Sequence, residues 1–182
     1  MPRPTKQQID DEILEAAAHL FARHGLKETS VQRIADTVGY SKTGLLHRFP
    51  TKEALQTAVI GRCVEQIRDT ASGVADLPPG PQRDRAVLTG LAELAVAQPG
   101  MVALLLSSLL AEPESEIGEA LAVIGEAIAG AFGDEPHTDT ERALRVTGAL
   151  GAVAVASIAL CGQLHPGAAT RLAAVGFDAL GH

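Results

Sequence analysis

The chain has 182 residues, of which 46% are hydrophobic and 20% charged, and its formal net charge is -7 at pH 7. This apolar content suits a globular protein of one or two domains and excludes an intrinsically disordered chain. The acidic balance excludes a surface that is basic all over, but nucleic-acid binding depends on where the basic side chains lie.

The charge is distributed unevenly along the chain. Residues 1–52 carry eight Lys and Arg against six Asp and Glu, whereas residues 53–182 carry seven against sixteen. All the lysines lie in the first of these segments. Such an asymmetry predicts an N-terminal unit that faces a polyanion and an acidic body behind it.

Two features bear on location. The N-terminal stretch has no apolar run like that of a signal peptide, which predicts a cytoplasmic protein. The apolar stretch between Gly148 and Gly162 is 15 residues long, shorter than the roughly 20 that a spanning helix needs. We therefore expect a buried helix of a soluble protein there, and no membrane partner.

The two cysteines, Cys63 and Cys161, form neither a CxxC motif nor a zinc-ligand spacing. Both fall in apolar helical patterns, so we expect buried, reduced thiols, with a redox-sensing pair as the alternative. The sequence predicts no metal site and no cofactor.

Apolar residues recur at helical spacing along the chain and predict an all-α fold of about nine helices. The first helix ends at Gly25, a residue that tolerates the left-handed conformation. A capping box at Thr29 starts the second helix, which ends at Gly39. The inward face predicted for the first helix is Ile9, Ile13, Ala16, Ala17, Leu20, Phe21 and His24.

Ser41 is predicted to cap a third, short helix through Phe49, and Thr51 a fourth. The fourth helix places Leu55, Val59, Cys63 and Ile67 on one face. Further helices are predicted after the breaks at residues 76–84 and 98–100. Pro113 should start another that ends near Phe132. A second capping box at residues 138–141 should start a long helix that ends near Leu164, and a last helix should end at Leu180.

The segment from Val31 to Phe49 has the spacing of a helix-turn-helix. Ala35 is small where a second helix would cross, Gly39 lies at the turn, and Leu45 would anchor the second helix in the core. This arrangement presents the outer face of one short helix to a major groove. That face would carry Lys42, Thr43, Gly44 and His47, with Arg48 nearby.

A wider pattern covers about residues 9–60. The stretches ILEAAAHLFARHG and TSVQRIADTVGYSKTGLLHRFPTKEAL resemble the N-terminal domain of the TetR (tetracycline-repressor) family of bacterial transcription regulators. The matching positions are Ala17, Phe21, Gly25, Thr29, Ile34, Ala35, Gly39, Ser41, Leu45, Phe49, Pro50, Lys52, Glu53 and Leu55.

The resemblance implies a DNA-binding domain at residues 1–52, with its helix-turn-helix at about 30–49, and a helical ligand-binding and dimerisation domain at 53–182. It implies DNA contacts from two groups of residues. The first is the recognition helix and its cap, and the second is the starts of the second and fourth helices. Together they are Thr29, Ser30, Arg33, Ser41, Lys42, Thr43, Gly44, His47, Arg48 and Lys52.

The chain departs from the usual family pattern at two places. Thr43-Gly44 reverses the common Gly-Thr order, and Leu46 stands where many members have a phosphate-contacting Tyr. These differences put any borrowed operator sequence in doubt, and Arg48 would supply part of the missing phosphate contact.

The same resemblance implies a small-molecule pocket and a dimer interface in the body. Candidate pocket residues are Met101, Leu104, Leu105, Ser108, Leu109, Val123, Ile128 and Val153. Candidate interface residues in the last two helices are Gly148, Ala152, Ala156, Leu172, Val175 and Phe177. On patterning alone, all of these positions also suit an ordinary core.

The expected function is therefore a ligand-responsive regulator. It would bind double-stranded DNA at a palindromic operator as a homodimer, act as a repressor, and be released by a small molecule of unknown identity. The alternative is a helical ligand-binding or interaction protein with a vestigial DNA-binding head. The sequence contains no nucleophile elbow, P-loop or HExxH motif, so we expect no enzyme and no catalytic residue.

Overall fold

The computed structural model describes residues 5–107, 116–133, 140–163, 165 and 167–182. In this part of the chain it contains nine α-helices, one 3₁₀ turn and no strand, which confirms the all-α prediction. The helices are α1 (Lys6–His24), α2 (Val31–Thr37), α3 (Lys42–Arg48), α4 (Lys52–Ser72), α5 (Pro81–Ala97), α6 (Pro99–Ser107), α7 (Glu116–Phe132), α8 (Thr140–Ala159) and α9 (Ala168–Ala179); the turn η1 (Cys161–Gln163) follows α8.

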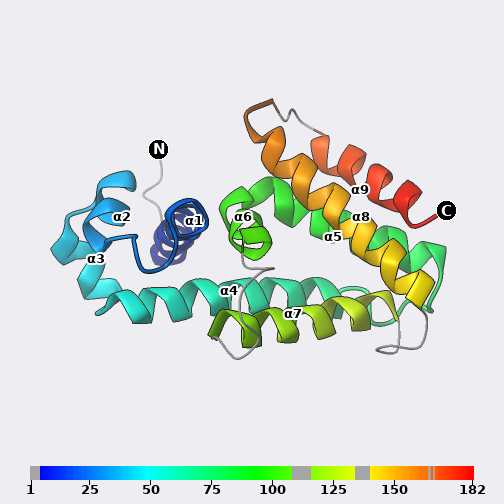
Figure 1. Cartoon of the computed structure of the whole chain (residues 1–182), viewed down its shortest axis with the longest axis horizontal. Coiled ribbons are helices and arrows are strands. Elements are labelled where there is room, and N and C mark those ends of the chain that lie inside the picture. The colour runs from blue at the N-terminus through cyan, green and yellow to red at the C-terminus, as the bar shows by residue number, and fades with distance from the viewer. Residues whose placement is uncertain (1–4, 108–115, 134–139, 164, 166) are drawn as a thin grey trace.

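Helix α4 runs beneath most of the molecule and joins its two ends (Figure 1). Helices α2 and α3 lie at one end, and α5, α8 and α9 gather at the other. Between them α1 lies beside α6, while α7 packs along the far half of α4. We call α1–α3 the head and α5–α9 the body, with α4 as the connecting helix.

Local capping explains where the head helices begin. Ser41 accepts a hydrogen bond from the backbone N–H of Gly44 at 3.0 Å, and Thr51 accepts one from Ala54 at 3.0 Å, as predicted. The start of α2 differs from the prediction, because Ser30 rather than Thr29 is the cap and accepts from the amide of Arg33. A capping box that the sequence analysis did not identify, Thr5 with Gln8, starts α1.

Two details of α1 correct the expectations. Gly25 ends the helix with φ 86° and ψ 154°, which is a positive-φ conformation but not the left-handed helical one. His24 is exposed, because the last turn of α1 extends beyond the core that covers Leu20 and Phe21.

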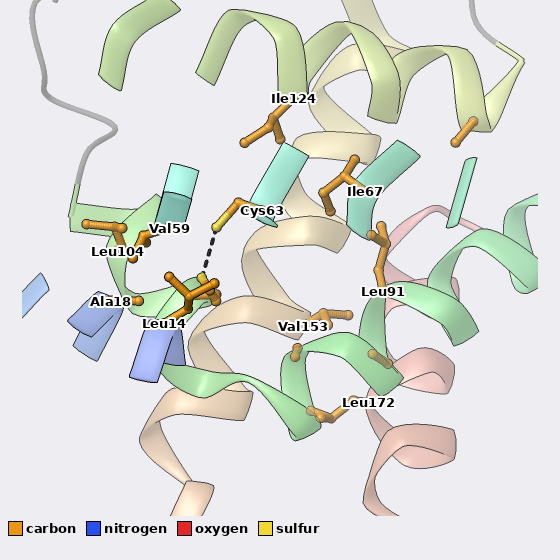
Figure 2. Close-up of a cluster of buried hydrophobic side chains, with 14 of the residues drawn as sticks. Leu14, Ala18, Val59, Cys63, Ile67, Leu91, Leu104, Ile124, Val153 and Leu172 are labelled. Carbon is orange, nitrogen blue, oxygen red and sulfur yellow. Dashed lines mark hydrogen bonds between the residues drawn. The ribbon is translucent and has the colours of Figure 1, made fainter. Parts of the chain in front are cut away.

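One continuous hydrophobic core joins head and body. Leu55, Val59, Cys63 and Ile67 are all buried on the inner face of α4, which confirms the predicted periodicity. Figure 2 shows how this face meets α1, α6 and α7: Leu14, Ala18 and Leu104 lie near Val59, and Ile124 lies over Cys63 and Ile67. The connecting helix therefore belongs to the packing of both units.

In the body, α5 and α6 form a bent pair with an angle of 102° between them, at the break predicted near residue 98. Helix α8 ends at Ala159, earlier than predicted, and η1 follows it. The start predicted at Pro113 and residues 138 and 139 of the second capping box lie outside the described residues.

A buried ion pair ties α5 to α8. Asp84, which is 1% exposed, accepts hydrogen bonds from both terminal nitrogens of Arg142 at 2.7 and 3.0 Å. His182 Nε2 lies 2.7 Å from the same carboxylate. Its ring also stacks on Phe177, so this cluster fixes the end of the chain against the body.

Helix α8 is long and apolar enough by composition to cross a membrane, and 17% of its apolar window is buried within the chain. It packs one side against α5, α6 and α9, where Val146, Ala149, Val153 and Ser157 are buried. The prediction of a buried helix therefore holds for one face only. Cys161 corrects another expectation: it lies in η1, past the end of α8, and is exposed.

Candidate functional site

The helix-turn-helix is built around three fully buried side chains. Ile34 and Ala35 of α2 and Leu45 of α3 are each 0% exposed. Between the two helices Gly39 has φ +71°, the left-handed conformation that glycine adopts without strain. The amide of Tyr40 then donates to the carbonyl of Ala35 at 2.9 Å, which closes the turn. This packing fixes the angle at which α3 leaves α2.

The outer face of α3 carries exposed side chains. Lys42, Thr43 and His47 are all exposed, as the helix-turn-helix interpretation requires. Gly44 is half-buried on the same helix, and a Cβ there would lie 3.1 Å from Oγ of Ser41. Glycine at this position therefore keeps the cap of α3 undisturbed, a reason the sequence analysis did not foresee.

Two basic residues next to this face make contacts within the head. The guanidinium of Arg48 forms an ion pair with Asp10 of α1. Nζ of Lys52 donates to the carbonyl of Lys27 at 2.7 Å and stays half-buried. Both contacts hold the ends of α3 and α4 against the rest of the head, and phosphate would have to compete with an existing partner.

At the start of α2 the residues predicted to contact DNA differ in exposure. Ser30 and Arg33 are exposed, whereas Thr29 is 0% exposed. The Thr29 hydroxyl lies 2.8 Å from the carbonyl oxygen of Gly25 and 3.1 Å from that of Leu20. In this arrangement Thr29 fixes the loop between α1 and α2, and its hydroxyl faces the protein interior.

Sequence reasoning overlooked Tyr40, the chain's one tyrosine, which is half-buried in the turn just before Ser41. A phenol carries a hydrogen-bond donor that suits phosphate, and its place beside the recognition helix was readable from the sequence. We add it to the candidate surface.

Comparison with known proteins agrees with this geometry. Residues 13–59 match the family model described as bacterial regulatory proteins, tetR family. The chain is 43% identical over 53 residues to the HTH-type transcriptional regulator RutR of Escherichia coli K12. It is 41% identical over 70 residues to the HTH-type transcriptional repressor KstR2 of Mycolicibacterium smegmatis. The N-terminal segment of the chain, residues 13–59, therefore matches the TetR family.

The two alignments cover 29% and 34% of this chain and only 25% and 34% of the respective relatives. Both relatives are named as transcription regulators. Solved structures show that the fold extends over the rest of the chain. The ketosteroid regulator KstR2 of Mycobacterium tuberculosis covers 98% of it, and 95% of that structure, at TM-score 0.65 and 17% identity. PfmR of Thermus thermophilus covers 92%, and 96% of that structure, at TM-score 0.62 and 20% identity.

In the body, helices α4, α5, α6, α7 and α8 line a cavity of about 340 Å³. Of the residues predicted to line a pocket, Met101, Leu105, Ile128 and Val153 meet there. Leu104 is buried but is not in the cavity wall, and Val123 lies in a separate depression between α4 and α7. Ser108 and Leu109 lie outside the described residues.

The cavity wall also includes side chains that the sequence analysis assigned only to the core or did not discuss. They come from α4 and α5, which lie far from α6 and α8 in the sequence, and are Cys63, Gln66, Ile67, Leu91, Leu94 and Ala95. Burial raises the pKa of the Cys63 thiol to about 12, and its Sγ lies 3.1 Å from Sδ of Met101 (Figure 2). Cys63 is therefore a neutral wall residue.

The predicted interface residues differ in how exposed they are. Gly148 and Val175 are exposed, and Ala152 and Ala156 are half-buried. Leu172 and Phe177 are buried inside the chain on the inner face of α9. An apolar strip of α8 that includes Leu144, 68% exposed, and Val155, 57% exposed, lies on the outside instead. We call Leu144, Gly148, Val155 and Val175 the outer apolar face.

Proposed function

We propose that the chain is a cytoplasmic transcription regulator that binds a palindromic DNA operator as a homodimer and is released by a small molecule. The observation that carries the DNA-binding part is the exposed side of α3, with Lys42, Thr43 and His47, on a helix-turn-helix whose core residues are fully buried. Exposed residues of the second helix in this motif contact base edges and phosphates.

The proposed division of the chain is a DNA-binding unit at residues 1–52 and a ligand-binding and dimerisation unit at residues 53–182. Within the first unit the candidate contacts differ in weight. Ser30, Arg33, Ser41, Lys42, Thr43 and His47 are exposed and remain candidates, as does Tyr40. Arg48 and Lys52 act only if DNA displaces their present partners, and Thr29 serves the fold.

The outer apolar face supports the homodimer. Large apolar side chains at 68% and 57% exposure, with small residues between them on one long helix, suit close packing against a second helix. A two-fold axis through this face would pair α8 with its copy and place two recognition helices side by side. Such helices reach successive major grooves when they lie about 34 Å apart.

The route from cavity to DNA is supported by α6. Met101 lines the cavity, and its backbone amide also donates to Glu15 of α1. A molecule that changes the position of α6 would therefore act on α1 directly, in addition to acting through α4. Release then follows as a population shift toward the arrangement that the molecule prefers.

The deciding experiment is a gel shift with the DNA that flanks the coding region, over a salt series. We expect a specific complex whose affinity falls steeply with salt, because basic side chains displace counterions. The variant Lys42→Ala/His47→Ala should lose it, while Arg171→Ala/His165→Ala, which removes one exposed Arg and one exposed His from the body, should retain it.

The contrary result is equally clear. The DNA-binding proposal would be rejected if wild type and both variants bound DNA equally and only at low salt, and if a random-site selection returned no sequence. That result would favour a vestigial head.

The dimer is tested separately by sedimentation. Leu144→Glu/Val155→Glu should sediment as a monomer, whereas Gln32→Glu/Thr37→Glu, which adds two charges to exposed positions of α2, should not. A dimer that survives the first pair of changes would contradict the proposed interface.

A further inference from the structure

The body cavity gathers apolar side chains from helices that are distant in sequence. Figure 2 shows Cys63 and Ile67 of α4, Leu91 of α5, Ile124 of α7 and Val153 of α8 around one region. All five line the cavity of about 340 Å³. Ligand sites span about 300–1,000 Å³, so this one suits a compact molecule at the small end of that range.

The described part of the cavity wall carries no Asp, Glu, Lys or Arg. An ionised group inside it would lose its hydration without gaining an opposite charge from these residues, which is costly. The wall therefore selects against carboxylates, phosphates and amines, and favours a neutral, largely apolar molecule.

Gln66 is one of two polar residues among the described residues of this wall. Its amide lies between Cys63 and Ile67 in the sequence of α4, and its Oε1 is buried. No donor among the described residues makes a hydrogen bond to that oxygen. Gln66 lines this cavity and also borders a depression between α4 and α5. Buried carbonyl oxygens are nearly always hydrogen-bonded, so a small turn of this side chain toward a donor on a molecule in the cavity would satisfy its oxygen.

Thr147 of α8 also lines the cavity, but this residue is exposed. Its hydroxyl can bond to solvent, so it has no comparable need for a ligand. The buried acceptor of Gln66 is thus the feature that would distinguish one apolar molecule from another.

We propose that the cavity binds a compact, neutral, apolar molecule with a single hydroxyl or N–H group, which donates a hydrogen bond to Oε1 of Gln66. This inference deepens the proposed function, because it assigns the chemical class of the effector. It rests on the proposed function only where it identifies the cavity as the effector site. Specificity arises because a molecule without the donor leaves the Gln66 oxygen unpaired.

Three probes that share one ring system test the proposal by isothermal titration calorimetry on the full chain without DNA. They are 2-naphthol, 2-methoxynaphthalene and 2-naphthoate. We expect 2-naphthol to bind wild type about 2- to 10-fold more tightly than the methoxy compound, as for one hydrogen bond, and 2-naphthoate to bind most weakly. Gln66→Leu should abolish the preference for the hydroxyl while still binding the methoxy compound.

Gln98→Leu is the matched control. Gln98 also has a buried, unpartnered Oε1 but is not among the cavity residues, so its substitution should leave the preference intact. Any of three results would overturn the proposal. Wild type binds 2-naphthol and 2-methoxynaphthalene with equal affinity, wild type does not bind 2-naphthol, or Gln66→Leu keeps the preference for 2-naphthol. Because no DNA is present, these outcomes are independent of whether the head binds an operator.

Discussion

Oε1 of Glu15 lies 2.5 Å from the backbone nitrogen of Gly100, across the contact between α1 and α6. The other carboxylate oxygen accepts from the amide of Met101 at 3.2 Å. A head residue thus caps the first turn of a body helix, where backbone amides have no helical partners. A Cβ on Gly100 would lie 2.7 Å from the Glu15 carbonyl oxygen, so only glycine permits this approach.

This contact should give stability a pH dependence. Burial raises the pKa of Glu15 above its usual 4.5, against the opposing effect of the two amides and His19. Just above pH 4.5 the unfolded chain has lost this proton while the folded chain keeps it, so the free energy of unfolding falls as pH rises. The fall ends once pH exceeds the folded pKa.

Glu15→Gln should remove that part of the pH dependence. Urea unfolding should be measured from pH 4 to 8. As pH rises above 4.5, the free energy of unfolding of Glu15→Gln should increase relative to that of wild type. Glu15→Gln should also lose a constant amount at every pH, because the glutamine has one acceptor oxygen where the carboxylate has two. Glu12→Gln, at an exposed position of the same helix, serves as the control. Parallel curves for Glu15→Gln and wild type would contradict the assignment.

Gly39→Ala should destabilise the head by about 1 kcal/mol, because an alanine at φ +71° is strained. A Cβ at Gly39 meets no atom within 4 Å, so the cost is conformational rather than steric. Gly61→Ala, on an open part of α4, should instead stabilise by about 0.5–1 kcal/mol. Urea midpoints that shift in the same direction for both variants would refute this account.

Thr29→Val should lower the free energy of unfolding by about 1 kcal/mol, through loss of the hydroxyl contacts to Leu20 and Gly25. Its operator affinity, measured where the variant is fully folded, should equal that of wild type. Lys42→Ala should do the reverse, with weaker DNA binding and unchanged stability. A large affinity loss in folded Thr29→Val would place this hydroxyl on DNA after all.

Arg142→Leu should destabilise the body by about 3 kcal/mol, because it leaves the carboxylate of Asp84 buried with His182 as its remaining partner. Glu141→Gln weakens the exposed pair with Arg145 on the same helix and should cost under about 1 kcal/mol. Thermal unfolding of the two variants measures the contrast, and equal losses would mean that the buried pair contributes no more than a surface pair.

Cys63 should resist alkylation in the native protein. Its pKa of about 12 leaves almost no thiolate at pH 8, and the thiolate is the reactive form. In a Cys161→Ser background, which leaves Cys63 as the chain's one thiol, iodoacetamide should react only after urea is added. Rapid labelling without urea would show that the cavity wall is open to reagents.

The sequence by itself determined the local features of the head and of the connecting helix. The turn at Gly39, the caps at Ser41 and Thr51, and the buried face of α4 depend on residues within about one helical turn of each other, so spacing reveals them. The exposed face of α3 follows from the same periodicity. The family's motif is local too, and the comparisons confirmed it.

Only the tertiary structure decided which of these residues have partners elsewhere. Arg48 pairs with Asp10, Glu15 caps α6, and Asp84 binds Arg142, over separations of 38, 85 and 58 residues. Thr29 turns inward, and the apolar residues of α8 divide between core and outer face. Such contacts depend on the angles at which whole helices pack, and these angles are set by many side chains at once, so no short pattern in the sequence records them.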